Sequence, residues 1–164
     1  MLKGRAFKFE DNISTDHIQP GRYNYLRSNL PELAKHALED AAPTFASRVK
    51  PGDFVVAGRN FGLGSSREHA PTIIKMAGVE AILAKSVARI FFRNAINVGL
   101  PVLICDIERI NDGDELEVDL EAGIVRDLSN GAILSFSKMP GVMLSILNEG
   151  GLVPYIKKYG DFKL

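Results

Sequence analysis

Three short apolar runs, at residues 54–58, 80–84 and 100–104, are separated by segments long enough for a helix. Runs of this length without polar alternation are typical of strands that are buried on both faces. A strand, a helix and a second strand in succession form a β-α-β unit, which joins parallel neighbours. The middle of the chain therefore predicts a parallel sheet with helices packed against it.

The two connecting helices have recognisable limits. We expect the first to run to about Ala77, with Gly78 as its C-terminal stop, and the second to span residues 87–97. The part of the chain before the apolar runs predicts an edge strand, a polar loop and a short helix, at residues 4–9, 10–21 and 31–38.

The C-terminal third has a different character, with short alternating runs between turn residues. These predict three antiparallel strands at residues 115–120, 123–128 and 132–136, followed by helical segments around residues 142–148 and 152–159. We therefore predict one compact α/β domain over residues 1–164. Its sheet is expected to be mixed and mostly parallel, with flanking helices and an antiparallel C-terminal portion.

The composition excludes several classes of function. Lysine plus arginine equals aspartate plus glutamate at 20 each, so the net charge favours neither nucleic acid nor an anionic membrane as partner. No apolar run approaches the length of a membrane span, and residues 1–7 lack the apolar core of a signal peptide, so we expect a cytoplasmic protein. The single cysteine, Cys105, excludes a multi-thiolate metal or iron–sulfur site on this chain, and the three histidines are not spaced as a metal site.

Chemistry is concentrated in residues 58–71, which we call the glycine segment. Gly62 and Gly64 allow positive φ and close approach of a ligand, and Ser65, Ser66 and Arg67 follow them directly. Backbone N–H groups at a helix start and a guanidinium fork suit a carboxylate. Two other interpretations are a capping box formed by Ser65 and Glu68, and a phosphate-binding loop. Pro71 disfavours the capping box, since it would fall in the second turn of such a helix.

Three ordered motifs extend the pattern over the whole chain: Ser-Thr-Asp-His at residues 14–17, Gly-Ser-Ser-Arg at residues 64–67 and Ala-Arg-Ile-Phe-Phe-Arg-Asn-Ala at residues 88–95. With them, the chain resembles the swivel domain of the aconitase superfamily. At this length it is similar to the small subunits of the 3-isopropylmalate dehydratase and homoaconitase family.

The resemblance implies a hydro-lyase that works with a large subunit, which carries a [4Fe–4S] cluster. It implies that Ser65 is the base that removes a proton next to a carboxylate, with Ser66 and Arg67 binding substrate carboxylate. Asp16 corresponds to an active-site aspartate of the family, although the residue type also suits turn capping. This chain itself is expected to bind no cofactor and no metal. Alone, it is expected to associate with itself through its unpartnered face.

The resemblance also places a substrate-discriminating loop at Tyr25, Leu26 and Arg27. An arginine there favours a distal carboxylate, as in homocitrate, whereas Tyr25 and Leu26 suit an alkyl tail such as isopropyl. Isopropylmalate, as an intermediate of leucine synthesis, is the first expectation, and homocitrate and 2,3-dimethylmalate are the alternatives. Arg89 and Arg93 share a helical face and are expected to serve packing or partner contact.

Two functions of other classes stay open. One is a non-catalytic module that binds phosphate or another anion, although the segment lacks the third glycine of a dinucleotide site and the lysine of a phosphate loop. The other is a structural or RNA-binding relative, which the zero net charge disfavours.

Overall fold

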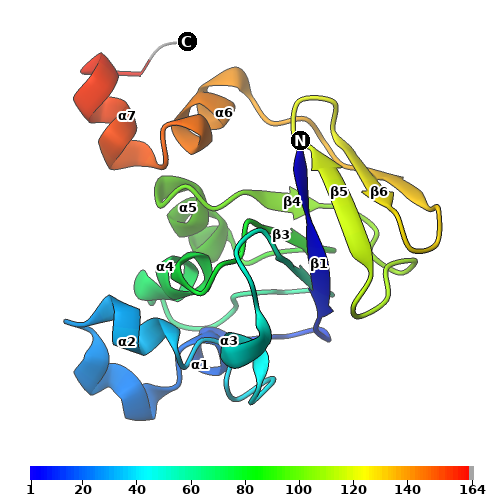
Figure 1. Cartoon of the computed structure of the whole chain (residues 1–164). Helices are drawn as coiled ribbons and strands as arrows, with labels where there is room; N and C mark the ends of the chain where they lie inside the picture. Colours follow the sequence, from blue (N-terminus) through cyan, green and yellow to red (C-terminus); the bar gives the residue numbers. More distant parts are fainter. Residues whose placement is uncertain (163–164) are drawn as a thin grey trace.

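The apolar runs are neighbouring parallel strands of one seven-stranded mixed sheet in the computed structural model, which describes residues 1–162 (Figure 1). The strand order across the sheet is β4-β3-β2-β1-β5-β6-β7. The strands are β1 (Leu2–Lys8), β2 (Phe54–Ala57), β3 (Ala81–Ala84), β4 (Val102–Ile104), β5 (Glu115–Asp119), β6 (Ile124–Asp127) and β7 (Ile133–Ser135).

Strands β1 to β4 form the parallel half of the sheet. Every residue of β2 and β3 is buried, which explains why their sequences are continuously apolar. Register pairs such as Val55 with Ile82 and Leu83 with Leu103 align the strands. The predicted parallel core is confirmed.

Strands β5, β6 and β7 form the antiparallel half, as predicted for the C-terminal third. Strand β5 pairs antiparallel with β1, with Leu2 opposite Val118. The prediction of an edge strand at residues 4–9 is therefore wrong, because β1 has β2 on one side and β5 on the other.

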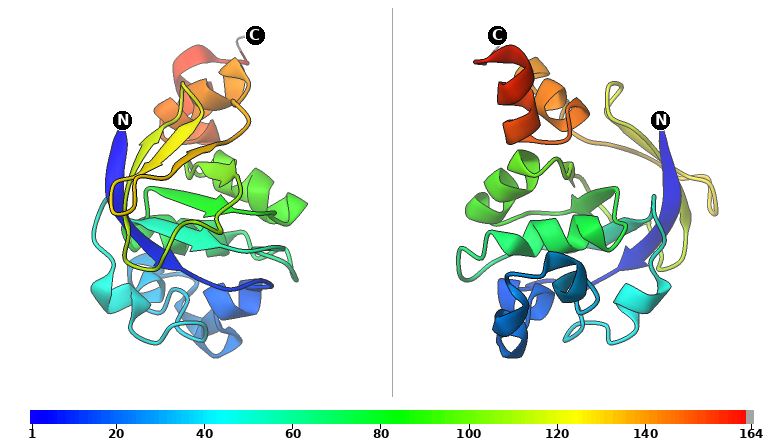
Figure 2. Two further views of the ribbon diagram at one scale, coloured as in Figure 1. Left: turned by 90° about the vertical axis from the view of Figure 1, so that its right-hand side faces the viewer. Right: turned by 60° about the vertical axis from the view of Figure 1, so that its left-hand side comes forward.

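Helices cover the parallel half on one face, and the antiparallel strands curl towards the other (Figure 2). Val55 of β2 packs with the helix residues Ile73 and Phe91, whereas its neighbour Val56 packs with Leu116 of β5. The helices are α1 (Thr15–Ile18), the 3-10 helix η1 (Gly21–Leu26), α2 (Leu30–Ala34), α3 (Phe45–Arg48), α4 (His69–Met76), α5 (Arg89–Asn97), α6 (Gly141–Asn148) and α7 (Leu152–Tyr159).

Several helix limits differ from expectation. The loop predicted at residues 10–21 contains α1, and η1 and α3 also lie outside the predicted elements. Helix α4 begins at His69, so Ser65 does not cap it and the capping-box interpretation is wrong. Pro71 then lies in the first turn, where its missing N–H costs no helical hydrogen bond. Within residues 1–162, every helix is too short or too polar to cross a membrane.

Candidate active site

The glycine segment leaves the end of β2 and lies against the start of α1. The N–H of Gly62 donates to the carbonyl of Ile13 at 2.7 Å, and the N–H of Thr15 donates to the carbonyl of Leu63 at 2.9 Å. Gly62 and Gly64 adopt φ of 79° and 109°, which a glycine accommodates without strain. These contacts bring the Ser-Thr-Asp-His and Gly-Ser-Ser-Arg motifs side by side.

Gly62 is also needed for packing, because a Cβ at this position would overlap the ring of Phe91 in α5. We expect Gly62→Ala to lower the free energy of unfolding by about 3 kcal/mol, from overpacking plus the strained φ. The melting temperature would fall by roughly 10 °C for a chain of this size. Gly131→Ala is the matched control, since Gly131 has the same φ of 79° with open space around it. Equal losses in both variants, measured by thermal unfolding, would contradict the Phe91 contact.

Ser65 is exposed, and its Oγ lies 3.1 Å from the Oγ1 of Thr15. Thr15 is only 2% exposed, and its backbone bond to Leu63 fixes its position. The hydroxyl pair therefore joins one accessible and one buried group. Thr15 was not among the predicted site residues. The sequence signal for it is its place in the Ser-Thr-Asp-His motif, directly before Asp16.

Arg67 is held by α1 through two contacts. Its Nη1 lies 2.7 Å from the Oδ1 of Asp16 and also donates to the backbone carbonyl of Gln19. Asp16 is available for this because Ser14 caps α1 instead, accepting from the N–H of His17 at 3.2 Å. The side chain of Arg67 is 26% exposed, so the guanidinium is oriented from one side and accessible from the other.

These groups border a cavity of about 380 Å³. Four predicted site residues line it, namely Arg27, Ser65, Ser66 and Arg67, and Asp16 adjoins it through its ion pair. Every lining residue within residues 1–162 carries a polar or charged side chain, and the set is Gln19, Asn24, Arg27, Ser65, Ser66, Arg67, Glu68 and His69.

Tyr25 and Leu26 do not line this cavity, contrary to the arrangement expected for an apolar pocket. Tyr25 is 74% exposed, and Leu26 packs against the hydrophobic core. The reason is the tight turn of η1, which directs successive side chains to different sides. Of Tyr25, Leu26 and Arg27, Arg27 alone lines the cavity.

The loop that carries Arg27 is anchored at its other end. Arg22 forms ion pairs with Asp40 at 2.7 Å and with Glu39 at 2.8 Å, and the ring of Tyr23 stacks on His36 at a centroid distance of 3.8 Å. The Arg22 guanidinium lowers the pKa of Asp40 below its ordinary value, which favours the charged pair.

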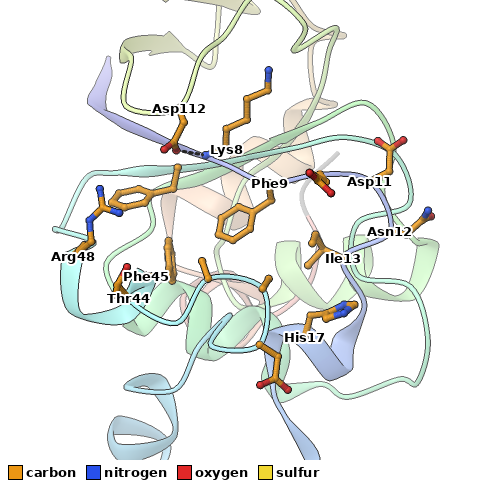
Figure 3. Close-up of a pocket in the computed structure, with 15 residues that line it drawn as sticks. Lys8, Phe9, Asp11, Asn12, Ile13, His17, Thr44, Phe45, Arg48 and Asp112 are labelled. Carbon is orange, nitrogen blue, oxygen red and sulfur yellow. Dashed lines mark hydrogen bonds between the residues drawn. The ribbon is translucent and has the colours of Figure 1, made fainter.

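Larger hollows lie elsewhere, so the site is assigned by its chemistry and not by its size. One of about 510 Å³ lies between the end of β1, α1 and α3, and Figure 3 shows Phe9, Phe45 and His17 in its wall. Another of about 720 Å³ lies between α5 and α6 and includes Arg89 and Arg93. Arg89 and Arg93 therefore line a different cavity from the one that contains Ser65 and Arg67.

The donor set of this chain does not suit an iron–sulfur cluster. Among residues 1–162 there is no group of three or more histidine, cysteine, aspartate or glutamate side chains placed to hold a metal ion. Burial raises the pKa of Cys105 to about 11, so this lone thiol is protonated at neutral pH.

Comparison with known proteins defines the class of protein to which this chain belongs. A family model described as the aconitase C-terminal domain matches residues 8–106, which include β2, the glycine segment and α5. The chain thus has the fold of the aconitase C-terminal domain.

Relatives that match over nearly the whole chain identify the family within this class. The 3-isopropylmalate dehydratase small subunit 2 of Archaeoglobus fulgidus is 64% identical over 99% of both chains. The methanogen homoaconitase small subunit of Methanothermobacter thermautotrophicus is 52% identical over 98% of this chain and 94% of its own. A crystal structure of 3-isopropylmalate dehydratase from Methanocaldococcus jannaschii superposes with a TM-score of 0.92 at 46% identity, covering 97% of this chain and 95% of that one. The chain belongs to the small-subunit family of 3-isopropylmalate dehydratase and homoaconitase. A small subunit implies a large-subunit partner.

Proposed function

We propose that this chain, with its large subunit, isomerises 2-isopropylmalate to 3-isopropylmalate by dehydration to an alkene followed by rehydration. The observation that carries the proposal is a polar cavity in which an accessible serine and an oriented arginine meet. The name of the 64% identical relative supports isopropylmalate as the first substrate to test.

In this proposal Ser65 removes the proton from the carbon next to a substrate carboxylate. A serine acts as a base only when positive charge and hydrogen-bond donors stabilise its alkoxide. The hydroxyl of Thr15, at 3.1 Å, donates to Ser65 in the charged state, and the Arg67 guanidinium borders the same cavity. Asp16 orients that guanidinium from the outer side.

Arg67 and Ser66 bind the carboxylate whose adjacent carbon loses the proton. The guanidinium supplies a planar fork that fits a carboxylate with two hydrogen bonds. One Arg67 nitrogen, Nη1, is already engaged by Asp16 and Gln19, which fixes the plane of the group before substrate arrives. Such preorganisation lowers the entropic cost of orienting the reacting carbon.

The other half of the chemistry belongs to the large subunit. A [4Fe–4S] cluster bound there supplies a Lewis acid for the departing hydroxyl. The residues of this chain hold the carboxylate and move the proton, so we expect the isolated chain to be inactive. The proposal therefore places substrate between the two subunits, over the cavity that contains Ser65.

Homocitrate is the second candidate, because Arg27 lines the cavity and the apolar residues Tyr25 and Leu26 do not. A distal carboxylate would find a guanidinium here, whereas an isopropyl group would depend on the large subunit for apolar contact. The binding-module alternative lacks a comparable observation.

The role of Arg27 is testable with Arg27→Val. We expect the ratio of kcat/KM for homocitrate to that for isopropylmalate to fall by about 10- to 100-fold, the worth of a charge-assisted hydrogen bond. The measurement is the initial rate of the reconstituted two-chain enzyme on both substrates. Arg109→Val, which changes an exposed arginine outside this cavity, is the control. An unchanged ratio in Arg27→Val would remove Arg27 from substrate selection.

A further inference from the structure

Gln19 connects the two arginines of the cavity. It is the C-cap of α1 and is 1% exposed, although it lines the cavity wall. Its backbone carbonyl accepts from Arg67. Its side-chain Nε2 donates to the Oδ1 of Asn24 at 3.2 Å, and the backbone carbonyl of Asn24 accepts from the Nε of Arg27 at 3.1 Å. Gln19 therefore contacts the Arg67 guanidinium directly. Through Asn24 it also contacts Arg27, the arginine proposed to face the substrate tail.

Packing does not explain a glutamine at this position. The Oε1 of Gln19 is buried and has no hydrogen-bond donor within residues 1–162. A buried acceptor without a donor costs roughly 1–3 kcal/mol, and a leucine of similar size would fill the same space without that cost. The contact that a glutamine makes here and a leucine cannot make is the hydrogen bond from Nε2 to Asn24.

That bond fixes the only part of η1 that faces the cavity. Arg22 and Tyr23 tie the start of η1 to Glu39, Asp40 and His36. The side-chain contact from α1 to Asn24 ties down its end, where Arg27 follows directly. Without it, the Asn24 carbonyl that orients Arg27 loses its attachment to the wall that contains Arg67.

We propose that Gln19 is a positioning residue that sets the orientation of Arg27 relative to Arg67, and thereby the choice among malate tails. This proposal rests on the proposed function only for its effect on substrate choice. The positioning itself is a property of the isolated chain. It acts through the Gln19–Asn24 hydrogen bond and does not require that Gln19 contact the substrate.

The positioning is tested by hydrogen–deuterium exchange on the isolated chain. Gln19→Leu should raise exchange across residues 21–27 by about 5-fold, the factor for one net hydrogen bond, and leave residues 59–68 unchanged. Its melting temperature should equal or exceed that of the wild type, since the orphan oxygen is removed. Asn24→Asp keeps the Oδ1 acceptor and should exchange like the wild type. Unchanged exchange in Gln19→Leu, or a general rise over both segments, would overturn the proposal.

The consequence is tested in the two-chain enzyme with a double-mutant cycle. Gln19→Leu should reduce discrimination between homocitrate and isopropylmalate by about 5-fold in the wild-type background, and have no further effect on it in Arg27→Val. A merely structural role would reduce both backgrounds equally and contradict the proposal. If the enzyme turns over neither substrate, the proposed function fails while the exchange experiment still decides the positioning.

Discussion

Ser65→Ala is expected to abolish turnover by the two-chain enzyme, with kcat falling by about a thousandfold. The substitution deletes the group proposed to take the substrate proton. It removes one hydrogen bond to Thr15 and no buried apolar surface, because Ser65 is exposed. The cost in folding free energy should therefore be about 1 kcal/mol or less. Steady-state rates and thermal unfolding measure the two quantities separately.

The matched control is Ser137→Ala, an exposed serine in the connection between β7 and α6. Both variants should assemble with the large subunit as the wild type does, by analytical ultracentrifugation. Only Ser65→Ala should lose activity. Normal turnover in Ser65→Ala would exclude the serine as base and leave the cavity a binding site only.

Arg67→Lys is expected to lower kcat/KM by about 100- to 1000-fold, mostly through KM. Lysine retains the charge but not the planar fork that binds a carboxylate with two hydrogen bonds. It also cannot reproduce the two contacts of Arg67 Nη1, to Asp16 and to the Gln19 carbonyl, while presenting the rest of a guanidinium to the cavity. A rise in KM with little change in kcat indicates that the lost interaction stabilised the bound substrate and the transition state equally.

Arg59→Lys is the control for this substitution, since Arg59 lies in the same glycine segment before the turn and does not line the cavity. Its KM should equal that of the wild type. Should Arg67→Lys also keep a normal KM, the substrate carboxylate must bind elsewhere, and the assignment of this cavity would be wrong.

The predictable part of the fold is the part determined by local pattern. The runs at 54–58 and 81–84 identify buried strands because they contain no polar side chain, and the helix between them has a glycine stop. The interior position of β1 was not predictable, because it depends on pairing with β5, more than a hundred residues away. Helix α1 has only four residues and depends on tertiary contacts such as the bond from Thr15 to Leu63.

The site also has residues that a local sequence motif predicts and residues that depend on the fold. Ser65, Ser66 and Arg67 are contiguous, so one motif identifies them together. Gln19 carries no such signal, since a lone glutamine before Pro20 resembles any loop residue. Its role exists only because the chain reverses after Pro20 and brings η1 to the glycine segment. Tyr25 and Leu26 were expected beside Arg27 because they adjoin it in sequence, but a 3-10 turn separates their directions.

The most direct test of the account is anaerobic reconstitution of this chain with its cluster-loaded large subunit, followed by absorbance of the alkene formed from isopropylmalate, homocitrate and 2,3-dimethylmalate. We predict alkene formation from isopropylmalate that requires both chains and disappears with Ser65→Ala. No turnover of any of the three malates, with an intact cluster and an assembled complex, would contradict the proposed function.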